Sequence, residues 1–166
     1  MLQKLFIKYK KAYQDYLSLS DYNVCQAPEY FLTVKIADAL KGLRLYVDLE
    51  CSVNLTLDKA GAKQPGPILK DIRRNGRFDF VAHSYKDKPR FIGEVKNSVS
   101  TPIRLENDLK IICHALDYGK TNSFQSGIIA FFVYKKIKKN SSEKLEELIS
   151  NIEKNVLKQV VNLILK

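Results

Sequence analysis

The chain has few of the residues on which several classes of active site depend. Only two histidines occur, His83 and His114, and nothing pairs either of them with the nucleophile and acid of a catalytic triad. The three cysteines, Cys25, Cys51 and Cys113, are far apart and odd in number. Their spacing fits neither a zinc site nor a disulfide framework. We therefore expect them to be small buried thiols in a reducing cytoplasm.

Long apolar runs are also missing. No stretch approaches the ~20 residues that a transmembrane helix needs, and segment 1–8 has neither a continuous apolar core nor a small-residue cleavage site. No P-loop is present, because the glycines of segment 61–66 are not followed by Lys and Ser or Thr. We expect a cytoplasmic protein without a signal peptide and without a membrane partner.

What the chain has in excess is positive charge. Its 28 Lys and Arg residues against 18 Asp and Glu residues give a formal net charge of +10. Such a balance raises the affinity for polyanions, above all nucleic acid. The alternative is a lysine-rich composition that serves only solubility, and charge alone does not choose between the two. The length of 166 residues and the hydrophobic content of 45% suit a single domain over 1–166.

The spacing of apolar residues predicts both helices and strands. Apolar residues at helical intervals predict helices over about 1–18, 27–42, 103–118 and from 141 to the end. Alternating or continuous β-branched and aromatic residues predict strands within 43–57, 77–83, 91–96 and 124–134. Segment 58–75, with two prolines and five basic residues, is predicted to be a loop that could grip phosphate. The class predicted is therefore α/β.

A hairpin over 77–96 is the centre of this pattern. Alternate residues of a strand share a face, so Glu94 and Lys96 should lie on one side of the sheet. A turn centred on residues 86–87 places Asp79 directly opposite Glu94. Residues opposed in this way have Cβ atoms roughly 4.5–5.5 Å apart. The sequence thus predicts two adjacent carboxylates with an amine one strand step away.

Two carboxylates so close in a mostly apolar sheet repel each other and are costly to desolvate. A divalent cation bound between them would remove that penalty. Mg²⁺ is the obvious candidate because it takes oxygen ligands and keeps several waters, and Mn²⁺ accepts the same ligands. The ammonium of Lys96 could then orient or deprotonate a water, or stabilise a developing negative charge.

The pattern of Asp79 followed by Glu94-x-Lys96 on a hairpin resembles the catalytic core of the PD-(D/E)XK nuclease superfamily. Phe78 stands where the motif that names the superfamily has a proline. The resemblance covers roughly 29–134, because the predicted order of helix, three strands, helix and strand matches the αβββαβ core of the restriction-endonuclease-like fold. It implies a mixed central sheet flanked by helices, here with extra N- and C-terminal helices.

The resemblance implies a metal-dependent nuclease that hydrolyses phosphodiester bonds, with DNA as substrate. It implies that Asp79, Glu94 and the carbonyl of Val95 bind Mg²⁺, and that Lys96 positions or activates the attacking water. Glu29, on the helix before the first strand, would hold a metal-bound water or a second ion. Its alternative role is that of an acidic residue at a helix N-terminus.

Two further side chains stay open at this point. Glu50 would stand near the hairpin if its strand pairs with it, and would otherwise face solvent. His83 shares the face of Asp79 by parity, and either touches substrate or is structural. The alternative function is a non-catalytic nucleic-acid- or protein-binding module on the same fold. For a nuclease without a separate recognition domain, dimerisation through the C-terminal helix would help targeting.

Overall fold

The structure is a computed structural model that describes residues 2–23, 26–62, 76–84, 88–99, 102–118, 124–133, 143, 146–147, 150 and 160–165. Its helices are α1 (Leu2–Ser20), α2 (Glu29–Lys41), α3 (Val53–Lys59) and α4 (Pro102–Tyr118). Its strands are β1 (Tyr46–Ser52), β2 (Arg77–His83), β3 (Pro89–Val99), β4 (Ser126–Val133) and β5 (Val160–Leu165). The predicted α/β class is confirmed.

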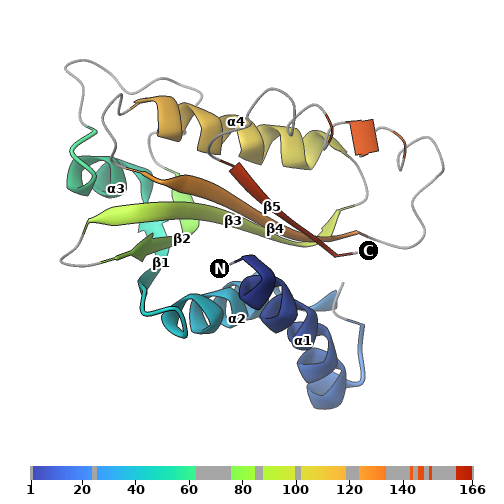
Figure 1. Cartoon of the computed structure of the whole chain (residues 1–166). Coiled ribbons are helices and arrows are strands. Elements are labelled where there is room, and N and C mark those ends of the chain that lie inside the picture. The colour runs from blue at the N-terminus through green and yellow to red at the C-terminus, as the bar shows by residue number, and fades with distance from the viewer. Residues whose placement is uncertain are drawn as a thin grey trace.

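The strands form one sheet in the order β1-β2-β3-β4-β5 (Figure 1). Strands β1, β2 and β3 pair antiparallel, whereas β4 runs parallel to β3 and β5 parallel to β4. Parallel neighbours need a crossover, which α4 supplies between β3 and β4. The sheet is therefore mixed, as predicted.

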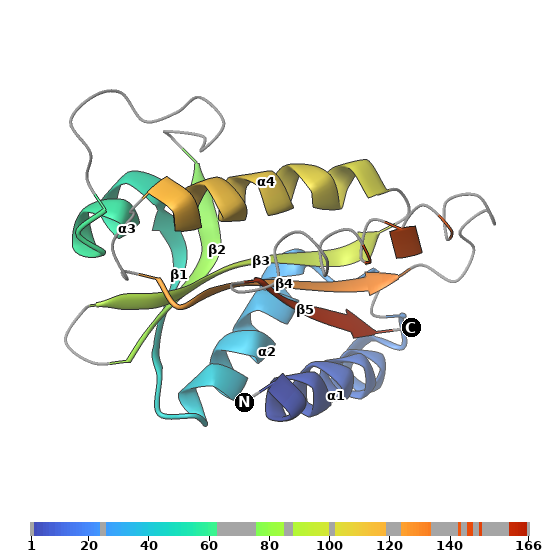
Figure 2. The ribbon, with the colours of Figure 1, turned by 45° about the horizontal axis from the view of Figure 1, so that its top comes forward.

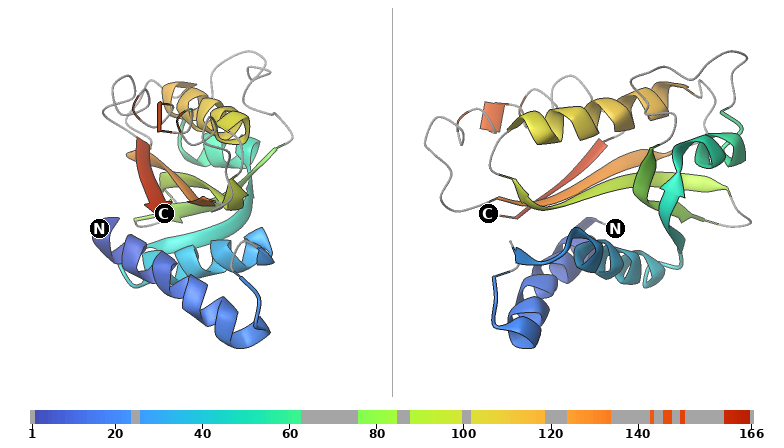
Figure 3. Two further views of the ribbon diagram at one scale, coloured as in Figure 1. Left: turned by 90° about the vertical axis from the view of Figure 1, so that its right-hand side faces the viewer. Right: turned by 180° about the vertical axis from the view of Figure 1, so that it is seen from behind.

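The helices form two layers with the sheet between them (Figures 2 and 3). Helices α1 and α2 cover one face, and α3 and α4 cover the other. The core on the α2 side includes Leu32, Ile36, Leu40, Phe80, Ala82, Val95 and Ile128. The core on the α4 side includes Val53, Phe78, Val81, Ile92, Leu105, Ile112 and Ile129. Burial on both faces explains why the central strands are so apolar.

A glycine lets helix α4 lie close to the sheet. A Cβ on Gly127 of β4 would come within 2.1 Å of Cγ2 of Ile112 on α4. That distance is far inside van der Waals contact, so only glycine allows the observed approach. The close packing sets the distance between α4 and the neighbouring strand β3.

The first strand is shorter than predicted. It ends at Ser52, and residues Val53–Lys59 form the short helix α3. The run of Val53, Leu55 and Leu57 alternates like a strand, but Val53, Thr56 and Leu57 are also spaced for one face of a helix and are buried. The hydroxyl of Thr56 donates to the carbonyl of Ser52 over 2.8 Å, one helical turn back. Local pattern could not decide between the two periods.

The prediction of a helix from 141 to the end is wrong for its last part. Val160–Leu165 form strand β5, paired with β4. The predicted fold with an extra C-terminal helix is corrected accordingly, and a dimer contact through that helix loses the apolar residues of this stretch. The cause is non-local: pairing with β4 favours a strand in a run rich in β-branched residues. The predicted loop at 63–75 and the turn at 85–87 lie outside the described residues.

Other boundaries differ less. Helix α2 begins at Glu29 with Pro28 as its N-cap, and β3 continues to Val99, three residues beyond the predicted end of the strand. In the part of the chain with described structure, no helix combines the length and apolar character needed to cross a bilayer.

Candidate active site

The hairpin has the register expected from the sequence. Phe80 pairs with Gly93, and the next two residues of β2 pair with Ile92 and Phe91 in the same antiparallel ladder. The ladder begins at Phe80 and Gly93, so Asp79 and Glu94 lie one residue beyond its first pair on their respective strands.

The carboxylate of Asp79 reaches across to the neighbouring strand. Its Oδ2 accepts a hydrogen bond of 2.6 Å from the backbone N–H of Val95. Burial raises the pKa of Asp79 above its ordinary value of 3.8, although the Val95 N–H and the charge of Lys96 oppose the rise. The charges of Glu50 and Asp108 raise the pKa further. A carboxylate in this environment gains from a nearby cation.

The ammonium of Lys96 lies among three carboxylates that come from three different elements. Its Nζ is 3.4 Å from Oδ2 of Asp108 on α4, and 3.9 Å from an oxygen of both Glu94 and Glu29. Burial by itself would lower the pKa of Lys96, but the acidic groups, Asp108 first, outweigh it and raise the pKa above 10.5. Lys96 is therefore protonated at neutral pH and acts in the structure as a cation, not as a base.

The first turn of α2 brings Glu29 to this cluster. A hydrogen bond of 2.8 Å from Nδ2 of Asn97 to the carbonyl of Ala27 ties the end of β3 to the segment just before α2. Helix α2 begins two residues later, at Glu29. The side chain of Glu29 is 46% exposed, whereas that of Glu94 is 8% exposed. Solvent therefore meets the cluster on the side of Glu29.

Glu50, which the sequence left open, lies on the strand that pairs with the hairpin and is exposed to solvent. Leu49 pairs with Phe80 and Cys51 with Phe78, so Glu50 and Asp79 are the residues that this ladder leaves between two pairs. The backbone of Glu50 is left-handed, with φ +52°. This conformation is rare for a residue other than glycine and is costly inside a strand. The charge of Glu50 acts on Asp79, as the rise in the Asp79 pKa records.

Asp108 is the site residue that sequence reasoning missed. It is buried on α4, at helical spacing from Leu105 and Ile112, which are 2% and 0% exposed. The available signal was an aspartate on the apolar stripe of a predicted helix, where an acidic residue is costly unless it has a partner. Nothing local identified Lys96 as that partner, because the two residues meet only after α4 folds back over β3.

His83 does not join the cluster. It is 4% exposed, and its Nε2 lies 3.1 Å from Oδ2 of Asp48, within ion-pair distance but without the geometry of a hydrogen bond. A buried imidazole beside a carboxylate of the edge strand β1 favours the structural role over contact with substrate.

The donor set suits a hard cation that needs few protein ligands. Among the described residues, no three His, Cys, Asp or Glu side chains converge to hold a metal ion by themselves. Asp79 and Glu94, with a main-chain carbonyl, offer only oxygen donors, which is the chemistry Mg²⁺ prefers while it keeps several waters. The chemistry of these donor atoms is therefore that of the predicted ion.

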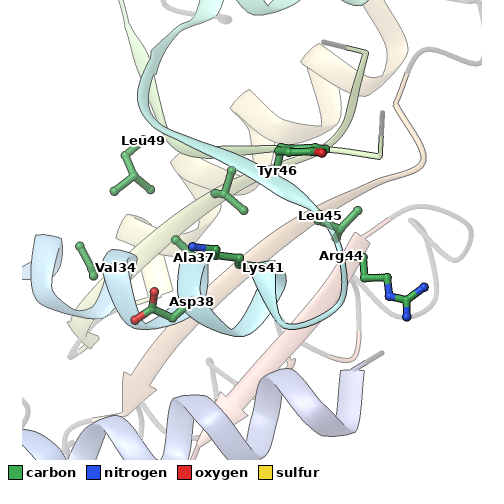
Figure 4. Close-up of a pocket in the computed structure, with 9 residues that line it drawn as sticks. Val34, Ala37, Asp38, Lys41, Arg44, Leu45, Tyr46 and Leu49 are labelled. Carbon is green, nitrogen blue, oxygen red and sulfur yellow. The ribbon is translucent and has the colours of Figure 1, made fainter. Parts of the chain in front are cut away.

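A separate groove lies between α2 and β1 (Figure 4). It has a volume of about 540 Å³ and is lined by Val34, Ala37, Asp38, Lys41, Arg44, Leu45, Tyr46, Val47 and Leu49. Most of its lining is aliphatic, and its charged residues come from the C-terminal half of α2 and the turn between α2 and β1. None of the predicted site residues lines it.

Comparison with known protein families, with curated proteins and with solved structures finds no match. The interpretation of the site therefore depends on its own geometry and chemistry.

Proposed function

We propose that the protein is a metal-dependent nuclease with a restriction-endonuclease-like core that hydrolyses phosphodiester bonds of DNA. The observation that carries the proposal is the link across the hairpin: Asp79 accepts a hydrogen bond from the N–H of Val95, and the Lys96 ammonium lies 3.9 Å from Glu94, the residue before Val95. Two acids and an amine on one hairpin match the pattern on which the resemblance to the PD-(D/E)XK superfamily was based.

The order of elements supports the same proposal. Helix α2, strands β1 to β3, helix α4 and strand β4 follow one another as in the αβββαβ core. The short α3 is inserted between β1 and β2, and β5 extends the sheet beyond β4. Neither addition changes the order of the core elements.

In the proposed site, Asp79, Glu94 and the carbonyl of Val95 hold Mg²⁺, and Mn²⁺ would serve equally. When bound, the ion supplies Lewis-acid polarisation of the phosphodiester. The N–H of Val95 fixes the Asp79 carboxylate by the 2.6 Å hydrogen bond, so this ligand is held in place before substrate arrives.

Lys96 acts on the attacking water and on the negative charge of the phosphoryl group. As a protonated amine it orients the water and stabilises the negative charge that develops on the phosphoryl oxygens. The water oxygen forms a bond to phosphorus as the water gives up a proton to solvent, the bond from phosphorus to the leaving oxygen breaks, and that oxygen takes up a proton from solvent. Glu29, on the exposed side, accepts hydrogen bonds from water entering the site.

DNA is proposed as substrate from the family resemblance together with the net charge of +10. The groove between α2 and β1 adds Lys41 and Arg44 on the outer surface of the sheet edge. The described residues include no separate recognition domain, so the proposal covers cleavage chemistry and not sequence preference.

The test is incubation of supercoiled plasmid with the purified protein in Mg²⁺, in Mn²⁺ and in EDTA, beside an Asp79→Ala variant. Asp117→Ala is the matched control, because Asp117 is an exposed aspartate of α4. We expect nicked or linear DNA only with the metal, and loss of at least about 100-fold in Asp79→Ala, since even outer-shell partners of a metal contribute 10–100-fold.

Two outcomes contradict the proposal. DNA binding without metal-dependent cleavage would favour the non-catalytic binding module. Cleavage that persists in Asp79→Ala at the level of the Asp117→Ala control would place the activity at another site or in a contaminant.

A further inference from the structure

Among the described residues, three acidic side chains lie within ion-pair distance of the Lys96 ammonium, one of them nearer than the other two. The Nζ–Oδ2 distance to Asp108 is 3.4 Å, against 3.9 Å to Glu29 and to Glu94. Asp108 is also the least exposed of the three, with a side chain that is 7% exposed. The shortest and most enclosed of the three contacts is thus made by a residue outside the hairpin motif.

Asp108 is held firmly by its surroundings. Its neighbours at helical spacing, Leu105 and Ile112, are buried in the core between α4 and the sheet. Ile112 in turn packs against Gly127, where the absence of a Cβ lets α4 lie close to β4. Figure 2 shows α4 running along β3 and β4. The carboxylate of Asp108 is therefore held in one position over β3.

The burial of Asp108 also leaves it in need of a cation. Its Oδ2 is shielded from solvent and has no hydrogen-bond partner among the described residues, so the ion pair is the compensation that the structure records. A buried carboxylate without a partner is strongly unfavourable. Asp108 and Lys96 consequently hold each other in place.

Glu94 cannot perform this role in the proposed reaction. As a ligand of the divalent cation it would share its charge with the ion, and the ion would repel the Lys96 ammonium. Asp108 reaches Lys96 from α4, in the helix layer across the sheet from α2, and is not one of the proposed metal ligands. It can therefore keep the ammonium beside the Asp79–Glu94 pair when that pair is neutralised.

We infer that Asp108 is a positioning residue that holds the Lys96 ammonium in reach of the attacking water. The inference deepens the proposed nuclease function and depends on it. Its effect on the reaction passes through Lys96, so it should change turnover and leave the binding of DNA and metal intact.

The first test compares Asp108→Asn and Asp108→Glu with the wild type, and uses Asp117→Asn, an exposed aspartate of the same helix, as matched control. Loss of the charge with little change of shape should lower kcat about 100-fold, the loss that a misplacement of about 1 Å can cause. KM for DNA and the metal concentration at half-maximal activity should change less than about threefold, since neither ligand set includes Asp108. Asp108→Glu should recover part of the loss.

The second test is a double-mutant cycle with Lys96→Met, a substitution that keeps most of the side-chain volume. If Asp108 acts through Lys96, adding Asp108→Asn to Lys96→Met should cause no further fall in kcat. In the metal-free proteins, Lys96→Met should lower the melting temperature because it leaves Asp108 without a cation, and the double variant should regain part of that loss.

The outcomes separate this inference from the function it depends on. Wild-type cleavage with an unchanged kcat in Asp108→Asn would overturn the inference alone. A fall in kcat caused by Asp108→Asn that is equally large in the wild type and in Lys96→Met would also overturn the inference alone. A fall in melting temperature with unchanged kcat per folded molecule would reduce Asp108 to a structural role. Absence of metal-dependent cleavage by the wild type would overturn both.

Discussion

The carboxylate of Asp79 accepts a 2.6 Å hydrogen bond from the backbone N–H of Val95 on the neighbouring strand. This contact joins Asp79 of β2 to β3 at the residue after Glu94, and the charge of Glu50 on β1 also acts on Asp79. An acid that is partly buried among other acids is a source of instability unless a cation accompanies it. The same arrangement therefore links the stability of the protein to its proposed chemistry.

Replacing Asp79 by Asn should stabilise the metal-free protein near neutral pH. Burial raises the folded-state pKa of Asp79 above 3.8, so its contribution to stability is complete below pH 3.8 and is lost as pH rises through the raised pKa. Asn cannot ionise, and its carbonyl can still accept from Val95. We expect a higher melting temperature for Asp79→Asn than for the wild type at pH 8 in EDTA, with the difference shrinking towards pH 4.

Addition of Mg²⁺ should raise the melting temperature of the wild type and not of Asp79→Asn, because a ligand that binds the native state stabilises it. A variant that is less stable than the wild type at pH 8 in EDTA, or one that Mg²⁺ still stabilises, would contradict the proposed electrostatics of the site.

Glu50 should show a conflict between stability and activity. Its φ of +52° is a left-handed conformation that costs a residue with a Cβ about 1–2 kcal/mol. Glu50→Gly removes that cost, whereas Glu50→Ala removes the carboxylate but keeps the cost. We expect the Gly variant to exceed the Ala variant by about 1 kcal/mol in free energy of unfolding, measured with urea. Strain of this kind is retained at functional sites, so both variants should cleave DNA more slowly. Equal free energies of unfolding for the two variants would contradict the cost assigned to the left-handed backbone at position 50.

Gly93 should not tolerate a side chain. A Cβ at this position would lie 2.0 Å from Cζ of Phe80, the residue with which Gly93 pairs and which is fully buried. Gly93→Ala should lower the free energy of unfolding by about 1–3 kcal/mol, as overpacking does. Adding Phe80→Leu should relieve the clash, so the alanine should cost less in that background. If the effects of Gly93→Ala and Phe80→Leu on the free energy of unfolding simply add, the Phe80 ring is not what excludes a side chain at position 93.

Cys51 should be an unreactive thiol at neutral pH. Burial, followed by the charge of Asp48, raises its pKa to about 11. At pH 8 about one thiol in 1000 would then be ionised, and the thiolate is the reactive form. In a variant with Cys25 and Cys113 replaced by serine, alkylation by iodoacetamide should be slow at pH 8 and should rise about tenfold per pH unit up to pH 11. Rapid modification of the folded protein at pH 8, equal to that in urea, would contradict the burial.

Much of the architecture could be predicted from the sequence because the signals were local. The hairpin over 77–96 has alternating residues and a polar turn, and a slip of one residue would carry Asp79 and Phe80 to the wrong faces. This constraint determined the register that pairs Phe80 with Gly93. Helices α2 and α4 were likewise indicated by apolar residues at helical spacing, and both were found close to the predicted bounds.

The remainder was decided by contacts between parts of the chain that are distant in sequence. Residues 53–57 satisfy both strand and helix spacing, and packing of Val53 and Leu57 into the core chose the helix. Val160–Leu165 became a strand because β4 offered an edge to pair with. Asp108 reached Lys96 only when α4 crossed back over β3, and Asn97 set the entry to α2 from 70 residues away. The register of the hairpin could be predicted from sequence because strand geometry is local, whereas the groups that hold Lys96 and Glu29 in place depend on how the layers pack.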